Sequence, residues 1–487
     1  MGAILCHTNI SEVVSKYTPK PVRNLTLTPG KFLVSLTWED PADYTEDGYT
    51  CAWVKTIVVR KQGGYPEDIH DGTVVVTTVE RNKYKSDSYN DTGLTAGTTY
   101  YYKVFTCSSD GIYGESCSGS AVPIQYRIMT VELNLACSNP KNIGSYSDNA
   151  IKMPSGKTND AVIAWQEFFG YRPCLFKSGK VVGYLNPNDY TKFEDGSAAD
   201  ITSGNAGDVM IEFPRRGVRI SKSGKVVTVS MTDEPDNPDF KYYAHQRGST
   251  NKDYFYLGAY FGTLYGNKVR SLSGKQAYTK AVLSTYYNNA VANGTGYGVL
   301  AFYQWTYIQA MYILQYAGNL NSISVHGRGT STSSTYYSGR GDTAGVLTGG
   351  SEITDPNKLF GLEDFFGTLE HALNNFYCSS GRYVSTTTDD TITNGDKYTY
   401  QNYQADYQNN SGYISMCIGS SDLGFICENG HYTGSSSTYF CDFSDLHSDS
   451  TPAVGLNGMF YFSSWGTNRY ANGDINPNIY STRLQYL

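Results

Sequence analysis

The chain has 487 residues, including 50 glycines and 44 tyrosines, and only 17% of its residues are charged. This length predicts two or more domains, and an aromatic content of 14% argues against a disordered chain. The net charge of −7 argues against nucleic acid or anionic membrane as the main partner, because both require a basic surface.

Residues 1–18 are an N-terminal segment with no basic region before a long apolar stretch, so we expect no secretory signal. No run of about 18 apolar residues follows, and no membrane insertion is predicted. None of the 10 cysteines forms a Cys-x-x-Cys pair, which argues against a zinc ribbon or thioredoxin motif. Buried free thiols are expected if the chain is assembled in a reducing cytoplasm such as that of bacteria. The open pairings are Cys107 with Cys117, and Cys417 with Cys427 or Cys441.

Residues 19–127 predict a small antiparallel β-sandwich. Short alternating strands are expected at 31–40, 52–61 and 98–108, because Gly, Pro and Asp turns separate these segments. Trp38 lies on the predicted strand at 31–40, where an inward aromatic side chain fills the space between two sheets.

Three features of this segment match one known family. Pro21, Leu25 and Leu27 open it, Trp38 follows, and Leu94 to Tyr100 has the pattern of a tyrosine corner, in which the phenol bonds to the backbone upstream. Together they resemble a fibronectin type III domain. That fold serves many purposes, so we interpret it as a spacer.

Residues 128–155 are expected to form a connector, in which a strand-like stretch passes into polar turns. Residues 156–487 are expected to form one large domain, with strands within 207–232 and 253–275. The predicted class is therefore mainly β, with an α+β head after the sandwich.

Two helices are predicted in this head, at 276–292 and 300–317. The second is apolar nearly all the way round, so it should be buried on most sides. Its aromatic residues, Trp305 among them, would also suit a cofactor pocket. Core packing is the better interpretation, because no charged or metal-binding residue interrupts the helix.

From residue 319 onward, long segments rich in Gly, Ser, Thr, Asn and Tyr alternate with short apolar segments at 412–419, 422–427 and 458–465. This pattern predicts a modest sheet with long loops. Loops of this length inside a compact domain are usually functional.

The stretch GLEDFFG at 361–367, which we call the central motif, carries a second resemblance. Ser-Trp at 464–465 and Arg-Leu at 483–484 belong to the same resemblance. The order of the motifs from 210 to the end is similar to that of the C-type-lectin-like domain in its formylglycine-generating-enzyme form, as found in phage tail fibres. The resemblance implies structural roles for Glu363, Phe366, Gly367, Trp465 and Arg483, and a buried ion pair between Glu363 and Arg483.

The enzymes of this fold require cysteine or histidine groups that this sequence does not place at the matching positions or spacing. The oxidases need a reactive cysteine pair or copper-binding thiols, and Cys378 is the only cysteine near the central motif. The sulfoxide synthases need a histidine cluster, but His326, His371, His431 and His447 show no ligand spacing. We therefore predict neither enzyme activity, nor a cofactor, nor a bound metal.

Three other motifs are weaker signals: a solvated turn is the better interpretation of the first, and calcium binding stays open. Glu234-Pro235-Asp236 only partly matches the calcium-dependent sugar site of lectins, and residues 389–396 do not follow the EF-hand order. Arg340-Gly341-Asp342 spells an integrin-binding tripeptide, which we interpret as coincidence. A carboxylate pair for glycoside hydrolysis stays open, because nothing in the sequence marks one.

The binding face is predicted in four tyrosine-bearing segments, at 326–350, 397–413, 429–441 and 465–470. Their composition resembles that of antibody contact loops, where Tyr supplies contact area and small polar residues adapt. The candidate receptor-binding residues are Tyr336, Tyr337, Arg340, Tyr398, Tyr400, Tyr403, Tyr407, Tyr413, Tyr432, Tyr439, Trp465, Asn468 and Tyr470.

These observations predict a non-enzymatic receptor-binding or tail-fibre-tip protein of a phage or phage-derived particle. Its partners would be a bacterial surface protein or glycan and other tail proteins, and its location the virion. A homotrimer is expected by analogy with tail fibres, with avidity adding strength. Two alternatives stay open, a structural virion component and a surface-polysaccharide-degrading enzyme.

Overall fold

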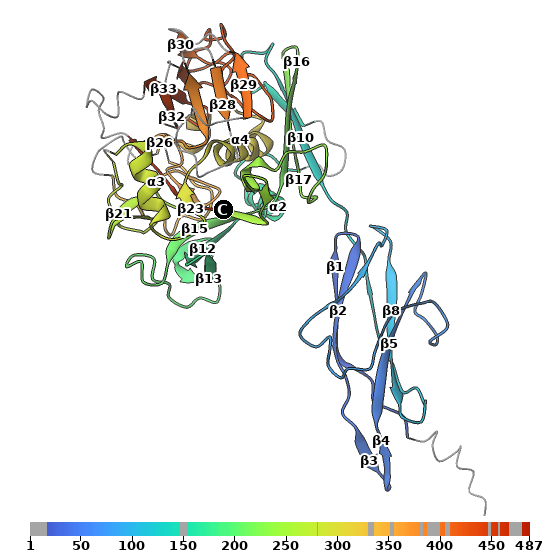
Figure 1. Ribbon diagram of the computed structural model, residues 1–487. Helices are drawn as coiled ribbons and strands as arrows, with labels where there is room; N and C mark the ends of the chain where they lie inside the picture. Colours follow the sequence, from blue (N-terminus) through green and yellow to red (C-terminus); the bar gives the residue numbers. More distant parts are fainter. Residues whose placement is uncertain are drawn as a thin grey trace, which may run out of the picture. The chain divides into compact units, whose positions relative to one another are not determined.

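The computed structural model describes residues 17–146, 153–279, 281–329, 336–350, 355–379, 383–386, 400–404, 410–446, 450–455, 458–466 and 480–487. The chain divides into two compact units, Met1–Tyr126 and Arg127–Leu487. Both are mainly β and contain antiparallel sheets, which confirms the predicted class in its coarse form. Figure 1 labels several elements of each unit.

The first unit contains two antiparallel sheets, in the strand orders β1-β2-β7 and β6-β5-β8-β9, and a small hairpin, β3-β4. The predicted strands at 31–40, 52–61 and 98–108 are β2, β5 and β8. The bounds are β1 Arg23–Gly30, β2 Leu33–Glu39, β3 Tyr44–Glu46, β4 Tyr49–Cys51, β5 Trp53–Gln62, β6 Thr73–Thr78, β7 Tyr89–Thr92, β8 Tyr100–Ser108 and β9 Cys117–Ala121.

The core of this unit lies between its two sheets. Val34 and Leu36 on β2 alternate with less buried residues and join Val58 of β5 in one apolar cluster. Trp38 is 1% exposed, and its indole Nε1 donates to the Asp40 carboxylate over 3.0 Å. The Tyr100 hydroxyl accepts from the Thr95 amide over 3.1 Å, which is the upstream contact that the tyrosine-corner pattern predicts.

Two sheets of the second unit are wholly antiparallel. One has the order β11-β10-β17-β16 and the other β14-β13-β12-β15-β20-β35-β23. The bounds are β10 Ile128–Asn134, β11 Gly144–Tyr146, β12 Arg172–Lys177, β13 Lys180–Asn186, β14 Asp189–Phe193, β15 Asp208–Pro214, β16 Gly217–Ser223, β17 Val226–Thr232, β20 Tyr254–Gly258, β23 Tyr297–Val299 and β35 Leu484–Tyr486. Residues 128–134, expected in a connector, thus form a strand that pairs with β17 over its whole length.

A third sheet follows the order β29-β28-β27-β32-β33-β31-β30, with β26 beside β32 and β34. The bounds are β26 Glu370–Ala372, β27 Phe376–Ser379, β28 Tyr383–Thr386, β29 Tyr400–Gln404, β30 Asn410–Tyr413, β31 Phe443–Leu446, β32 Ser450–Val454, β33 Phe462–Gly466 and β34 Tyr480–Ser481. The short pairs are β18 Gln246–Arg247 with β19 Thr250–Asn251, β21 Thr263–Tyr265 with β22 Lys268–Arg270, and β24 Lys358–Leu359 with β25 Leu362–Glu363.

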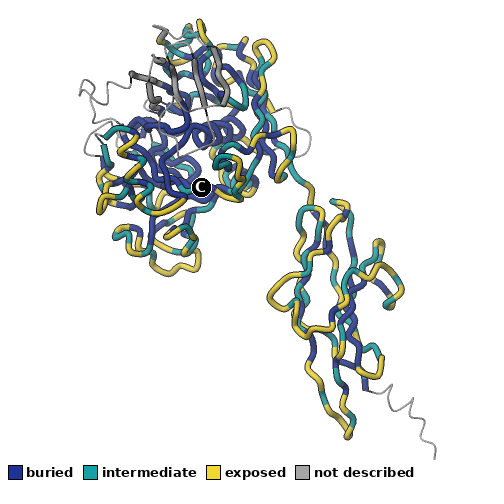
Figure 2. The backbone as a smooth tube through the Cα atoms, in the orientation of Figure 1, coloured by how far each residue is buried: buried dark blue, intermediate teal, exposed yellow. Residues whose placement is uncertain are grey.

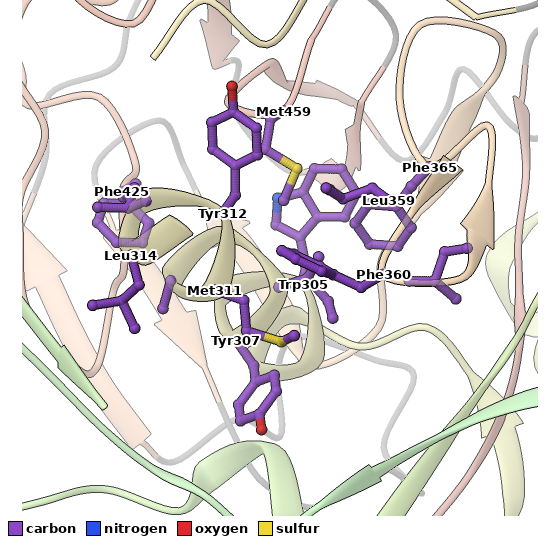
Figure 3. Close-up of a cluster of buried hydrophobic side chains, with 14 of the residues drawn as sticks. Trp305, Tyr307, Met311, Tyr312, Leu314, Leu359, Phe360, Phe365, Phe425 and Met459 are labelled. Atoms are coloured by element: carbon purple, nitrogen blue, oxygen red, sulfur yellow. The ribbon is translucent and has the colours of Figure 1, made fainter. Parts of the chain in front are cut away.

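Helix α4, Phe302–Tyr316, is the centre of the second unit's core, and every one of its residues is buried. Side chains leave it in several directions in Figure 3, with Tyr307 and Tyr312 on opposite sides. Trp305 stacks on Phe365 with ring centroids 4.7 Å apart. The tube in Figure 2 is buried along this helix. The predicted helix at 300–317 and its role in core packing are confirmed.

The other predicted helix is shorter than expected. Helix α3 spans Leu283–Val291, because Gln276 forms a β-bridge with Tyr337 and the Ala277 amide donates to the Tyr336 carbonyl. These contacts hold residues 276 and 277 in an extended conformation.

Three further elements of the described second unit are α2 Asn159–Phe169, α5 Ser322–His326 and the 3₁₀ turn η1 Tyr243–His245. Helix α2 was not predicted, although its sequence carries both end signals. Thr158 caps its N-terminus, and Gly170, with φ +72°, ends it in the left-handed conformation.

Candidate functional site

The central motif places Glu363 inside the second unit with 0% of its surface exposed. Its carboxylate accepts three hydrogen bonds, from the Tyr336 hydroxyl over 2.9 Å, the Gly339 amide over 2.8 Å and the Gly341 amide over 2.6 Å. Burial raises the pKa of Glu363 to about 7. The carboxylate therefore fastens the 336–341 segment to β25, and it has no access to a substrate.

Lys358 lies opposite Glu363 in the β24-β25 pair and is also 0% exposed. Its ammonium donates to the Gly341 carbonyl over 2.7 Å and lies 3.5 Å from the centre of the Tyr190 ring. Burial lowers the pKa of Lys358 to about 8. Asp342 accepts from Ser273 over 2.6 Å and from Tyr260. The Gly and Asp of the Arg-Gly-Asp sequence are thus held by the protein itself.

Glu363 and Arg483 do meet, but not as the expected ion pair. The Arg483 guanidinium donates to the main-chain carbonyl of Glu363, and also to the carbonyls of Gly258 over 3.1 Å and Ala259 over 2.9 Å. It lies 4.8 Å from the centre of the Phe261 ring. The physical reason is that the carboxylate already has three donors of its own, so the guanidinium binds carbonyls.

The remaining residues of the central motif are also in the interior. Phe366 is 0% exposed, and Gly367 adopts φ +91° with its amide 2.6 Å from the Gly455 carbonyl. The His371 ring is stacked on Phe261 at 4.4 Å, and its Nε2 is 3.1 Å from the Phe365 carbonyl. Burial lowers the pKa of His371, so this imidazole is neutral and structural.

A cavity of about 590 Å³ lies beside this core, and we call it the Arg328 cavity. Its walls come from helix α5 and the residues around it, from β30 and β31, and from two turns. The lining residues are Asn321, Ile323, Arg328, Tyr413, Ser436, Cys441, Phe443 and Tyr461. Its volume lies within the range of pockets that hold small ligands.

The walls of the Arg328 cavity combine aromatic and polar groups. Tyr413 and Phe443 meet edge to face, with centroids 5.5 Å apart and ring planes at 89°. The Tyr461 hydroxyl donates to the buried carboxylate of Glu370 over 3.0 Å. Burial raises the pKa of Cys441 to about 12, so its thiol stays neutral. The arrangement suits binding of a polar ligand with an apolar face.

The cationic group of the cavity is Arg328, an exposed residue that follows α5. Within the residues that the structure describes, its guanidinium has neither a hydrogen bond nor an ion pair. Arg328 lies in the predicted binding segment 326–350 but was not among the candidate residues, and no sequence signal joins it to Phe443 or Tyr461.

The structure separates the predicted receptor-binding residues into different environments. Tyr336 is 2% exposed and bonds to Glu363, so its expected role in receptor contact is wrong. Tyr337 is 47% exposed, and Arg340 is also exposed. Tyr413 lines the Arg328 cavity.

The other predicted residues fall into three groups. Tyr432 and Tyr439 are half-buried and pack against the main core. For Tyr400 and Tyr403 in β29, and for Trp465 in β33, only the strand backbone is described. Outside the described residues lie Tyr398, Tyr407, Asn468, Tyr470, His447 and residues 389–396.

The described residues offer neither a metal-binding cluster nor a membrane-spanning helix. Over the described ranges, no group of three or more His, Cys, Asp or Glu is placed to hold a metal ion. None of the helices in the described part is long and apolar enough to cross a membrane. A separate cavity beside Tyr303 and Tyr307 measures only about 20 Å³, room for one water.

Comparison with known proteins gives no assignment. No family model matches this chain, and no curated protein matches it in sequence.

Proposed function

We propose that this protein is a non-enzymatic receptor-binding protein of a bacteriophage or phage-derived particle, and that its second unit attaches the particle to the bacterial surface. The observation that carries the proposal is the Arg328 cavity. Four segments that are far apart in sequence line a space of about 590 Å³ with aromatic and hydrogen-bonding groups, through Asn321, Ile323, Arg328, Tyr413, Ser436, Cys441, Phe443 and Tyr461.

A binding role is favoured over catalysis by the position of the ionisable groups. Glu363 and Lys358 are 0% exposed and are held by contacts within the protein. A general acid or base must reach the proton that it transfers. These groups therefore support a rigid head better than they support chemistry on a substrate.

The proposal includes a fibronectin type III-like spacer and a C-type-lectin-like head. The spacer is supported by the two sheets of the first unit and by the hydrogen bond between Thr95 and Tyr100. The head is supported by the contact between Glu363 and Arg483, which joins the central motif to the last strand. In the virion, several copies would add avidity to each cavity.

The experiment is binding of the fluorescently labelled full chain to a panel of bacterial strains, with and without a chelator and with and without surface protease. The proposal expects strain-specific staining. Absence of staining on every strain, together with capture of tail proteins from disrupted virions, would favour a structural virion component instead. Release of sugars from stained cells would favour the polysaccharide-degrading enzyme.

A further inference from the structure

The inference that follows rests on the proposed function and concerns the chemistry of the ligand. Arg328 is exposed, lines the cavity, and has no partner within the described part of the chain. A guanidinium presents paired N–H donors that match the two oxygens of a carboxylate. The most prominent charge offered to a ligand in this cavity is therefore positive.

Among the described residues, two acidic side chains next to the cavity wall, Asp442 and Glu370, are buried and hydrogen-bonded within the protein. Asp442 follows Cys441 in the chain, but its side chain is buried and accepts from the Phe460 amide over 2.6 Å. Burial raises the pKa of Asp442 to about 8, so most of it is neutral at pH 7. The Glu370 carboxylate is 2% exposed and accepts from the Tyr461 hydroxyl.

The other walls match a sugar ring better than a protein surface. Tyr413 and Phe443 offer aromatic surface, against which the C–H face of a sugar packs. Asn321 and Ser436 supply polar groups within reach of hydroxyls. A protein partner typically needs a broad contact of about 800 Å² on each side. An open-mouthed cavity of about 590 Å³ instead suits a short stretch of an oligosaccharide.

We propose that the Arg328 cavity binds a carboxylate-bearing sugar of an acidic surface polysaccharide. Arg328 holds the carboxylate, and Tyr413 and Phe443 contact the ring. The carboxylate could belong to a uronic acid or to a sialic-acid-type sugar, because both present the same group to a guanidinium.

The test uses the full chain and the purified surface polysaccharide of a strain that it stains. The polysaccharide is used in its native form and after chemical reduction of its carboxylates to primary alcohols, which removes the charge and leaves the rings. Polygalacturonate and polysialate, each with its carboxyl-reduced form, are the probes if no strain is stained. Affinities are measured by calorimetry.

Four proteins are compared, the parent chain, Arg328→Gln, Arg328→Lys and Lys180→Gln. Lys180 is an exposed cation on β13, in a different sheet, so its substitution controls for the loss of one positive charge. Arg328→Lys keeps the charge and loses the paired donors. All four must show the same melting temperature, which is expected for substitutions at exposed positions.

The expected result is that Arg328→Gln weakens binding of the acidic polysaccharide by about 10- to 100-fold, as loss of a charged hydrogen bond does. Arg328→Lys should be intermediate, Lys180→Gln should be unchanged, and carboxyl reduction should remove the difference between parent and Arg328→Gln. Cell staining that survives Arg328→Gln, together with polysaccharide binding that survives carboxyl reduction, would overturn the cavity proposal and leave the receptor-binding function standing. Failure of every strain and every probe would overturn both.

Discussion

The guanidinium of Arg483 donates to the main-chain carbonyl of Glu363, and this contact ties the last strand of the chain to the central motif. The same guanidinium binds the carbonyls of Gly258 and Ala259 at the end of β20. Its charge is fully buried and faces the ring of Phe261. One side chain therefore joins three segments that lie far apart in sequence.

Replacement of Arg483 by Met should destabilise the second unit by about 3 kcal/mol or more, because three buried carbonyls lose a charged donor. The measurement is the free energy of unfolding in urea, followed by tryptophan fluorescence. Arg172→Met is the control, since Arg172 is 42% exposed and pairs with a half-exposed Glu194. That change should cost under about 1 kcal/mol. Equal effects of the two substitutions would contradict the structural role of Arg483.

Two neighbouring tyrosines give a matched test of burial. Tyr336→Phe removes the hydroxyl that donates to the Glu363 carboxylate and should cost about 1–3 kcal/mol of stability. Tyr337→Phe changes an exposed side chain and should stay within about 0.5 kcal/mol. Thermal unfolding of the two variants side by side measures the difference. If Tyr337→Phe were the more damaging change, the assignment of buried and exposed residues in this segment would be wrong.

The backbone of Arg328 packs directly against a glycine of the central motif. Gly367 adopts φ +91°, and a Cβ there would lie 1.8 Å from the Arg328 carbonyl oxygen. Gly367→Ala should therefore cost more than about 3 kcal/mol or prevent folding, since the backbone of residue 328 must move. Gly430 has a similar φ of +78° but nothing within 4 Å of the added Cβ. Gly430→Ala should cost only the conformational strain of about 1–2 kcal/mol. Soluble yield and melting temperature distinguish the two.

The raised pKa of the buried Asp442 side chain predicts a pH dependence of the free energy of unfolding. Burial raises its pKa from 3.8 to about 8 in the folded chain, so the folded state holds a proton that the unfolded state releases above about pH 4. The stabilisation that comes from this proton on Asp442 is complete below about pH 4 and is lost as the pH rises toward 8. Relative to Asp442→Asn, the parent chain should lose at least about 1 kcal/mol of stability between pH 5 and pH 8. Urea unfolding at several pH values measures this, and parallel curves for the two proteins would refute the assignment.

Some elements could be predicted because a local pattern determines them. Helix α4 has apolar residues all round and no charge, which requires burial wherever the helix packs. Trp38 and Tyr100 likewise follow from the alternation of β2 and from the turn before β8. Strand β10 was recognised only as strand-like, because its partner β17 lies about a hundred residues further on.

The site itself could not be derived from local patterns. Tyr336 and Tyr337 are adjacent in one tyrosine-bearing segment, and contacts with residues far away in the sequence, Glu363 and Phe261 among them, bury Tyr336 alone. The Arg328 cavity combines residues from four separate segments, and Phe443 lies more than a hundred residues from Arg328. Composition predicts that such loops bind, but long-range packing decides which side chains face the ligand.

The most direct test of the central claim is binding of the labelled full chain to whole bacteria, with Arg328→Gln and Lys180→Gln measured in parallel. We predict strain-specific staining that Arg328→Gln weakens and Lys180→Gln leaves unchanged. Equal staining by all three proteins would show that the receptor is bound elsewhere on the head. A broad panel without any staining by the folded parent chain would contradict the receptor-binding function itself.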